Sequence, residues 1–247
     1  MFDLEATIGR HALTVDCAPA ATREIVGLAH ALAKLNTIAR RRSTSEETVP
    51  NPDSLLTIHM AASLDGFIAR RDGRVDWLET SDEFAGGETV DPAFVKAFLK
   101  TIDCYVMGSR TYETALRFEA QGFGWAYGDT TTFVLTSRDL PRTRDTVHFH
   151  SGDLAQFVNG HLRPTFRNIW FVGGGVVSTE CLNRGLADEV RYSILPVLIG
   201  EGIPFFEKLD SDIALHLAEV KAYKSGMVEL RYEVRGARVE ARGASQF

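Results

Sequence analysis

Apolar residues between positions 55 and 234 gather in short runs bounded by glycine, proline and polar residues, a pattern typical of buried strands. The expected strands span 55–63, 102–107, 132–137, 147–149, 168–172, 188–198, 215–223 and 227–234. Helices are expected at 92–100 and 152–162, and from positions 109 and 176 onward. Strands alternate with helices and then follow one another directly. We therefore predict an α/β fold with a mostly parallel sheet and an antiparallel C-terminal hairpin.

The pattern changes outside this region. Apolar residues recur at helical spacing between positions 20 and 42, which predicts an amphipathic helix. Residues 43–54 are polar with two prolines and predict a linker. We therefore expect a helical N-terminal extension and linker at 1–50, one main domain at 51–235 and a loose C-terminal tail at 236–247.

The strand expected at 168–172 ends in three consecutive glycines, Gly173, Gly174 and Gly175, and Val176 begins the helix that follows. Glycines let the backbone approach an anion closely, and a helix start offers free N–H groups and the positive end of the helix dipole. This pattern favours a phosphate site. A tight turn without a ligand is the alternative, because the spacing is not the full dinucleotide fingerprint.

Two further strand ends carry groups that suit phosphate oxygens. They comprise Gly108, Ser109, Arg110 and Thr111 after one strand, and Thr136, Ser137 and Arg138 after another. Together with the glycine turn, they would suit a dinucleotide that has a third anionic group, for which Arg110 and Arg138 are candidates. No acidic residue follows the first glycine turn to take a ribose 2′-hydroxyl, so the pattern favours NADPH over NADH.

Composition narrows the classes of partner. The formal net charge is −6, which disfavours a nucleic-acid surface. Cys17, Cys104 and Cys181 are far apart, so no metal site and no disulfide framework is indicated. No apolar run reaches the ~18 residues of a membrane helix. The N-terminus lacks the pattern of a secretory signal, so we expect a cytoplasmic protein that binds no membrane.

Six stretches resemble, in order, the dihydrofolate-reductase-like superfamily: SLDGFIA (63–69), VDWLE (75–79), YVMGSRTYE (105–113), FVLTSR (133–138), WFVGGG (170–175) and DEVRYSILPVLIGEGIPFF (188–206). They are more similar to the branch that includes the reductase domain of the bifunctional riboflavin-biosynthesis deaminase/reductase (the RibD C-terminal domain). The resemblance covers roughly residues 55–234 and leaves 1–50 outside. It implies a three-layer NADPH-binding fold with a cleft between two subdomains.

The resemblance also implies roles for the three strand ends. Residues 109–111 match the segment that holds the adenosine-side phosphates, and residues 136–138 match the 2′-phosphate and adenosine segment. Residues 173–176 match the pyrophosphate turn. Residues 65–77 match a mobile loop that closes over the nicotinamide and excludes water.

The chain departs from the family on the substrate side. Dihydrofolate reductases carry a carboxylate on the first helix of the domain, and that place falls near Phe94 here. Asp91, about one turn earlier, is explained as a helix cap before Pro92. The ribosyl-phosphate set of the riboflavin-pathway reductases and their zinc deaminase domain are both missing. Asp65 is then the candidate for a catalytic proton relay or substrate contact, and Trp77 for a cleft wall, with a plain turn and a core aromatic as the alternatives.

We therefore predict an NADPH-dependent reductase, similar to dihydrofolate reductase or 5-amino-6-(5-phosphoribosylamino)uracil reductase. It would transfer a hydride to a small pterin- or pyrimidine-like heterocycle, with Asp65, Trp77 and Phe94 as candidate substrate contacts and no metal. The alternative is a nucleotide-binding or regulatory module without turnover, which the missing carboxylate favours. Unpaired sheet edges seek partners, so we also expect a homodimer.

Overall fold

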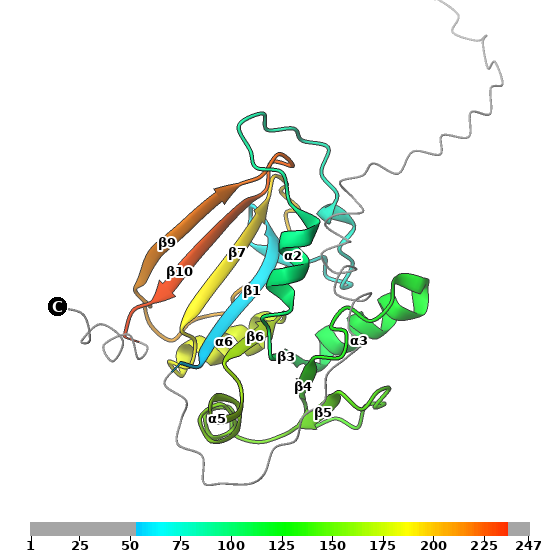
Figure 1. The fold of residues 1–247 in the computed structure, drawn as a ribbon, viewed down its shortest axis with the longest axis vertical. Coiled ribbons are helices and arrows are strands. Elements are labelled where there is room, and N and C mark those ends of the chain that lie inside the picture. The colour runs from blue at the N-terminus through cyan, green and yellow to red at the C-terminus, as the bar shows by residue number, and fades with distance from the viewer. Residues whose placement is uncertain (1–52, 237–247) are drawn as a thin grey trace, which may run out of the picture.

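The computed structural model describes residues 53–236 (Figure 1). The predicted extension and linker at 1–50, Cys17 and all of the tail except Gly236 lie outside the described residues. The large sheet contains β1 (Leu55–Ser63), β3 (Cys104–Gly108), β4 (Thr131–Leu135), β5 (Val147–His150), β6 (Asn168–Val172), β7 (Glu189–Leu195), β9 (Leu215–Ala222) and β10 (Val228–Val234). The helices are α2 (Pro92–Leu99), α3 (Ser109–Phe118), α4 (Leu154–Phe157), α5 (Arg163–Thr165) and α6 (Gly175–Asn183).

The eight strands of this sheet lie in the order β5-β4-β3-β6-β1-β7-β10-β9. Neighbouring strands from β5 to β7 are parallel. β10 runs antiparallel to β7, and β9 runs antiparallel to β10 at the edge of the sheet. The predicted mostly parallel sheet with an antiparallel C-terminal hairpin is therefore confirmed.

The predicted strands differ from the observed ones mainly at their ends. β1 and β6 have the predicted bounds. β7 stops at Leu195, three residues before the predicted end, because Pro196 cannot donate a backbone hydrogen bond. The helix predicted at 152–162 is a longer stretch in which α4, a π-helical turn at Val158–Leu162 (η3) and α5 follow one another. Its start is shifted to Leu154 because the carboxylate of Asp153 caps it.

Two strands were not predicted. β2 (Phe67–Ala69) and β8 (Ile203–Pro204) pair as a small antiparallel sheet from segments for which no strand was predicted. Gly202 lets the two segments approach, since a Cβ atom there would overlap the backbone oxygen of Ala69. Strands this short carry no readable hydrophobic alternation, which explains the miss.

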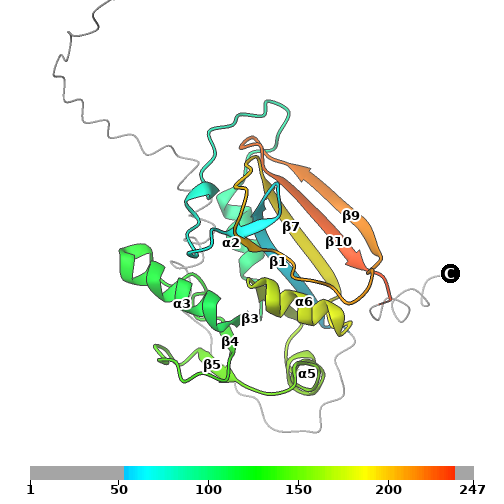
Figure 2. The same ribbon diagram turned by 180° about the vertical axis from the view of Figure 1, so that it is seen from behind.

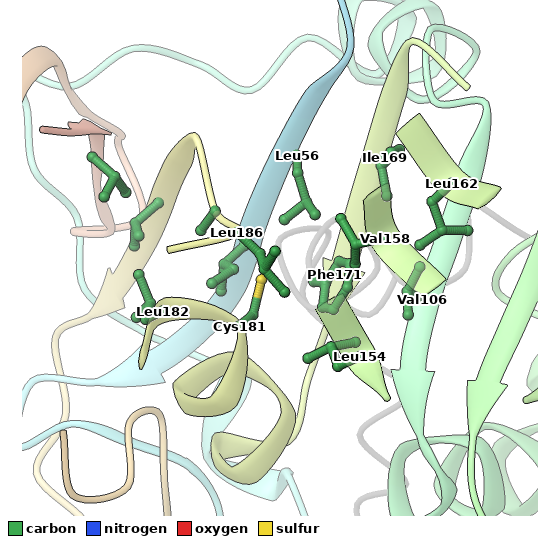
Figure 3. Close-up of a cluster of buried hydrophobic side chains, with 14 of the residues drawn as sticks. Leu56, Val106, Leu154, Val158, Leu162, Ile169, Phe171, Cys181, Leu182 and Leu186 are labelled. Atoms are coloured by element: carbon green, nitrogen blue, oxygen red, sulfur yellow. The ribbon is translucent and has the colours of Figure 1, made fainter. Parts of the chain in front are cut away.

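Helices cover both faces of the large sheet, which gives three layers (Figures 1 and 2). On one face, Leu56, Phe171 and Cys181 belong to a cluster that joins β1 and β6 to α6 and the α4–α5 stretch (Figure 3). On the other face, Tyr105 and Tyr112 belong to a cluster that joins β3 to α3. Alternate residues of each strand thus point into different cores.

A buried ion pair fixes the starts of the central strands. The Arg163 side chain, only 2% exposed, donates to Asp188 at 2.9 Å and to the backbone oxygens of Ser54 and Leu186 at 3.2 and 2.6 Å. Asp188 also accepts the N–H of Leu56 at 2.7 Å. Because a buried charge is costly without its partner, this pair ties β1 and β7 to the α5 helix.

The expected helix cap is confirmed at α2. The carboxylate of Asp91 accepts the N–H of Ala93 at 2.8 Å, and Pro92 occupies the first helical position. Asp91 is therefore engaged by the helix start. Cys104 and Cys181 are fully buried free thiols, as expected for small hydrophobic residues.

Candidate functional site

The three predicted phosphate segments follow strands that are neighbours in the sheet. β3 lies between β4 and β6, and all three run parallel, so their carboxyl ends meet at one edge. Gly108, the last residue of β3, lies opposite Leu135, the last residue of β4. The structure thus places residues 108–111, 136–138 and 173–176 side by side. In open α/β sheets this edge is where ligands bind.

The glycine turn after β6 packs directly on the start of α3. Gly173 and Gly174 have φ angles of 67° and 80°, which residues with a Cβ rarely adopt. A Cβ atom on Gly173 would lie 2.8 Å from Oγ1 of Thr111, and one on Gly175 would lie 2.6 Å from the backbone oxygen of Pro204. The turn therefore needs glycine for its backbone and for close contact with the neighbouring strand end.

Both helices at this edge begin without a side-chain cap. Within the described residues, no side chain accepts the first N–H groups of α3, whose N-cap is Gly108, or of α6, whose N-cap is Gly174. The first N–H groups of a helix have no partner inside the helix, so two such starts side by side are a ready site for anions. Val176, in the first turn of α6, is 63% exposed.

Arg138 is held by α3. Its guanidinium forms a two-point ion pair with Glu113, at 2.5 and 3.1 Å, and the Thr136 hydroxyl accepts its backbone N–H at 3.0 Å. This pairing holds the pKa of Glu113 below its usual range and raises the pKa of Arg138. Both side chains stay partly exposed, at 54% and 40%, so the pair is open to an incoming anion. Ser137 and Arg110 are exposed at the same edge.

Asp65 joins two loops. Its carboxylate accepts the N–H of Gly200 at 2.7 Å and that of Ile199 at 3.2 Å, which connects the turn after β1 to the loop after β7. A hydrogen bond from the Ser63 hydroxyl, together with these backbone N–H groups, lowers the pKa of Asp65. Asp65 is therefore an ionised, exposed residue that positions the loop 65–77.

Trp77 lies in a short 3-10 helix, Asp76–Leu78 (η1), and is 4% exposed. It packs in one cluster with Leu195 of β7 and with Met227, which directly precedes β10, and Ala61 of β1 packs against that cluster. Its indole N–H is buried and has no hydrogen-bond partner among the described residues. Phe94 lies on α2, and its side chain is outside the described part of the chain.

A polar face of the sheet was missed by the sequence reasoning. His59 of β1, Ser193 of β7 and Glu229 of β10 lie on the face of the sheet against which α2 packs, and α2 itself lies beside β1 (Figure 1). Nε2 of His59 lies 2.9 Å from Oγ of Ser193, whose hydroxyl donates to Glu229 at 3.4 Å. Burial first, and then the nearby charge of Arg191, lower the pKa of His59 to about 3, so its ring is neutral at pH 7. The sequence did contain a signal for this polar face, because Thr57, His59 and Ser63 occupy alternate positions of β1.

Charges on the same face compensate one another. Glu189 pairs with Arg191 at 2.7 Å and with Arg231 at 3.0 Å. Glu219 pairs with Lys221 at 3.2 Å and with Arg231 at 3.5 Å. The guanidinium of Arg191 also lies 5.0 Å from the ring centre of Phe98 of α2. The two arginines are thus engaged by carboxylates, and Arg191 is also engaged by a ring.

The described residues contain no group of three or more histidine, cysteine or acidic side chains placed to hold a metal ion. Within the same part of the chain, no helix has both the length and the apolar character needed to cross a membrane.

Comparison with known proteins decides the family. The model of the RibD C-terminal domain matches residues 54–229. The chain belongs to the RibD C-terminal domain family. It is 30% identical over 175 residues to YwjB of Bacillus subtilis (strain 168), a protein of uncharacterised function, with 71% of this chain and 95% of YwjB covered.

Solved structures agree with this assignment. A protein from Shewanella sp. PV-4, provisionally described as a riboflavin biosynthesis protein, is 28% identical, with a TM-score of 0.62 over 73% of this chain and 99% of that protein. The Thermotoga maritima deaminase and 5-amino-6-(5-phosphoribosylamino)uracil reductase shares the fold, with 14% identity and a TM-score of 0.51 over 73% of this chain and 56% of that one. The predicted RibD-type, dihydrofolate-reductase-like fold is confirmed. Family membership supports a reductase-type role for the domain.

Proposed function

We propose that this protein is an NADPH-dependent reductase that transfers a hydride to a C=N or C=O group of a small, pterin- or pyrimidine-like heterocycle. The observation that carries the proposal is that the carboxyl ends of β4, β3 and β6 lie side by side. The helices α3 and α6, which follow β3 and β6, both begin there without a side-chain cap. Such a row suits the phosphates of one dinucleotide. In this proposal NADPH supplies the hydride, and the protein supplies binding and orientation.

Each strand end has its own part in this proposal. The backbone N–H groups at 174–176 bind the pyrophosphate, helped by the dipole of α6. Ser109, Arg110 and Thr111, at the start of α3, bind the phosphates on the adenosine side. Thr136, Ser137 and Arg138 bind the adenosine and its 2′-phosphate. Glu113 stands beside that phosphate, so Arg138 must divide its charge between a carboxylate and an anion.

The loop 65–77 closes the site in this proposal. Within it, Arg70 pairs with Asp76 at 2.6 Å and Arg74 pairs with Asp72 at 2.7 Å, which keeps the loop compact. Asp65 anchors the start of the loop to the segment after β7. Closure would exclude water from the reacting atoms and order the hydride donor against its acceptor.

Nucleotide titration of the full-length protein tests the proposal. We expect NADPH to bind and Arg138→Ala to weaken its binding by roughly tenfold or more, with little change for NADH, which lacks the 2′-phosphate. Arg184→Ala is the matched control. Arg184 also forms ion pairs, with Glu180 and Asp153, but it follows the C-terminal end of α6, away from the proposed phosphate site. Equal affinity for NADPH in the wild-type and Arg138→Ala proteins would contradict the assigned 2′-phosphate site.

A nucleotide-binding module without turnover is the second candidate. One observation favours it: α2 contains no acidic residue, and Asp91 before it is engaged as the cap. Oxidation of NADPH, followed by its absorbance with pterin, pyrimidine and imine substrates, separates the two functions. Tight binding without oxidation across that panel would favour the module.

The homodimer remains a proposal as well. β9 forms an edge of the sheet and exposes Leu215, Leu217 and Val220 by 42%, 47% and 55%. Exposed apolar residues on an edge strand favour contact with another chain. Light scattering tests this, and a monomer at micromolar concentration would contradict it.

A further inference from the structure

One carboxylate on the face covered by α2 differs from its neighbours. Glu189 and Glu219 each pair with two cations. Glu229, on the same face of β10, forms no ion pair within the described residues, and its contact there is the Ser193 hydroxyl at 3.4 Å. A partly buried carboxylate without a cation retains the capacity to accept further hydrogen bonds. Among the described residues of this face, Glu229 is therefore the carboxylate that can accept hydrogen bonds from a ligand.

The groups around Glu229 leave its charge in place. The imidazole of His59 is neutral, since burial lowers its pKa to about 3, so it orients Ser193 without acting as a counter-ion. Tyr223 is half-buried, and burial together with the charge of Glu229 raises its pKa to about 12. Its hydroxyl is therefore protonated and able to donate. Lys221 lies opposite Glu229 in the register of β9 and β10 but pairs with Glu219, and the other groups named here are neutral.

Two aromatic side chains with unused donors lie on the same face of the sheet, Trp77 beside this cluster and Trp170 on β6, three strands from Glu229. Trp77 and Trp170 both have a buried indole N–H without a partner in the described part of the chain. Trp170 stacks on His59 at 4.8 Å, and Trp77 packs near Ala61, the residue opposite Ser193. Buried donors without partners are rare in folded proteins and call for a ligand or water that accepts them. The flat ring of Trp77 favours a planar molecule.

This cluster adjoins the proposed cofactor edge. His59 lies opposite Val172, the last residue of β6, and Gly173 follows at once. Ser193 lies opposite Ala61, two residues before the end of β1. Ser193 lies two strands and Glu229 three strands from β6, so a molecule held by these two residues would face the glycine turn across β1.

We propose that the Glu229 carboxylate and the Ser193 hydroxyl form the substrate-orienting site, and that they bind a planar nitrogen heterocycle through adjacent N–H groups on one edge. The inference rests on the reductase function proposed above. Among the described residues, Arg191 and Arg231 of this face are paired with Glu189 and Glu219 and are only 21% and 26% exposed, against 54% for the paired Arg138, so they are less accessible to a phosphate group. The substrate is then an unphosphorylated heterocycle, and Glu229 supplies the carboxylate that α2 lacks.

Two probes of similar shape test this site by calorimetry on the full-length protein, with and without NADPH. 2,4-Diaminopyrimidine offers N–H donors, and 2,4-dimethylpyrimidine replaces its amino groups by methyl groups. We expect the wild type to bind the diamino probe roughly tenfold tighter or better, because hydrogen bonds to a charged group give discrimination of that order. Glu229→Gln should remove this preference.

Glu219→Gln is the matched control, because its carboxylate lies on the same face but is engaged by Arg231 and Lys221, and it should keep the preference. Ser193→Ala, which removes a hydroxyl without adding bulk, should reduce the preference by a few fold. No preference in the wild type, or an unchanged preference in both Glu229→Gln and Ser193→Ala, would overturn the proposal. NADPH affinity is measured in parallel and should not change in Glu229→Gln. A protein that binds the diamino probe but not NADPH would overturn the proposed function and leave this site standing.

Discussion

The edge of the sheet and the face under α2 are built in different ways. At the edge, each contribution is a short continuous segment: residues 108–111, 136–138 and 173–176 follow strands that lie side by side. On the face, His59, Ser193 and Glu229 come one each from β1, β7 and β10, separated by 134 and 36 positions. A surface made of backbone turns can hold a common group such as phosphate. A surface made of single side chains can change its hydrogen-bonding groups one residue at a time. We therefore expect the face, and not the edge, to determine which substrate is bound.

The largest effect is expected at the edge, from Gly173→Ala. The φ of 67° is strained for alanine, and the new Cβ atom would meet Thr111 at 2.8 Å. The turn must then move away from α3, so we expect NADPH binding to fall by roughly 100-fold, an effect of about 2.7 kcal/mol, in calorimetric titrations.

Gly185→Ala is the matched control for backbone strain. Gly185 has a similar φ of 62° and follows α6, but a Cβ atom there would meet nothing within 4 Å. Similar losses of NADPH affinity in both variants would show that strain alone matters, and the contact with Thr111 would then have no part in binding.

The face should respond to pH, and the edge should not. The pKa of His59 is about 3 in the folded protein, against an ordinary value of 6.5, so protons favour the unfolded chain. The contribution of His59 to stability is therefore complete above about pH 6.5 and is lost as the pH falls toward 3. Between pH 6.5 and 4.5 we expect about 2–3 kcal/mol of the free energy of unfolding to disappear through this group. Denaturant titrations at both pH values measure it.

His59→Gln should remove that part of the pH dependence. His216→Gln, at an exposed position on β9, should keep it and serves as the control. If His59→Gln lost as much stability as the wild type between the two pH values, the neutral buried imidazole would be disproved.

The smallest effect is expected from Glu113→Gln at the edge. Removing the charge of Glu113 frees Arg138 from its ion pair and removes repulsion of a nearby 2′-phosphate. Exposed charge pairs contribute about 0.2–1 kcal/mol, so NADPH should bind roughly two- to fivefold tighter, with no change for NADH. Glu119→Gln, which releases Arg144 instead, is the control. Weaker NADPH binding in Glu113→Gln would mean that the carboxylate positions Arg138 and does not compete for its charge.

The sequence was informative where the signal is local. Asp91-Pro92 predicted the start of α2, and the glycines after residue 172 predicted the end of β6. The three phosphate segments were recognised individually, since each places its special residues next to a strand. That β3 would lie between β4 and β6 was not readable from those residues, because strand order depends on packing across the whole domain.

The face under α2 could not be predicted in the same way. The alternation of Thr57, His59 and Ser63 marks a polar face of β1, but nothing near it in the chain indicates Ser193 or Glu229. Their contact follows from strand register, which the hydrophobic pattern sets for whole strands. β2 and β8 were missed for a related reason, since their pairing joins residues far apart in the chain. Asp65, predicted from its place after β1, is at the expected strand end, where its carboxylate joins two loops.

A crystal structure of the full-length protein with bound NADPH tests the central claim most directly. The proposal predicts pyrophosphate oxygens within hydrogen-bond distance of the first N–H groups of α6, the 2′-phosphate against Arg138, and the nicotinamide beside Ala61 with Ser193 and Glu229 beyond it. A nucleotide bound away from the three strand ends, or a nicotinamide turned away from the face under α2, would contradict it.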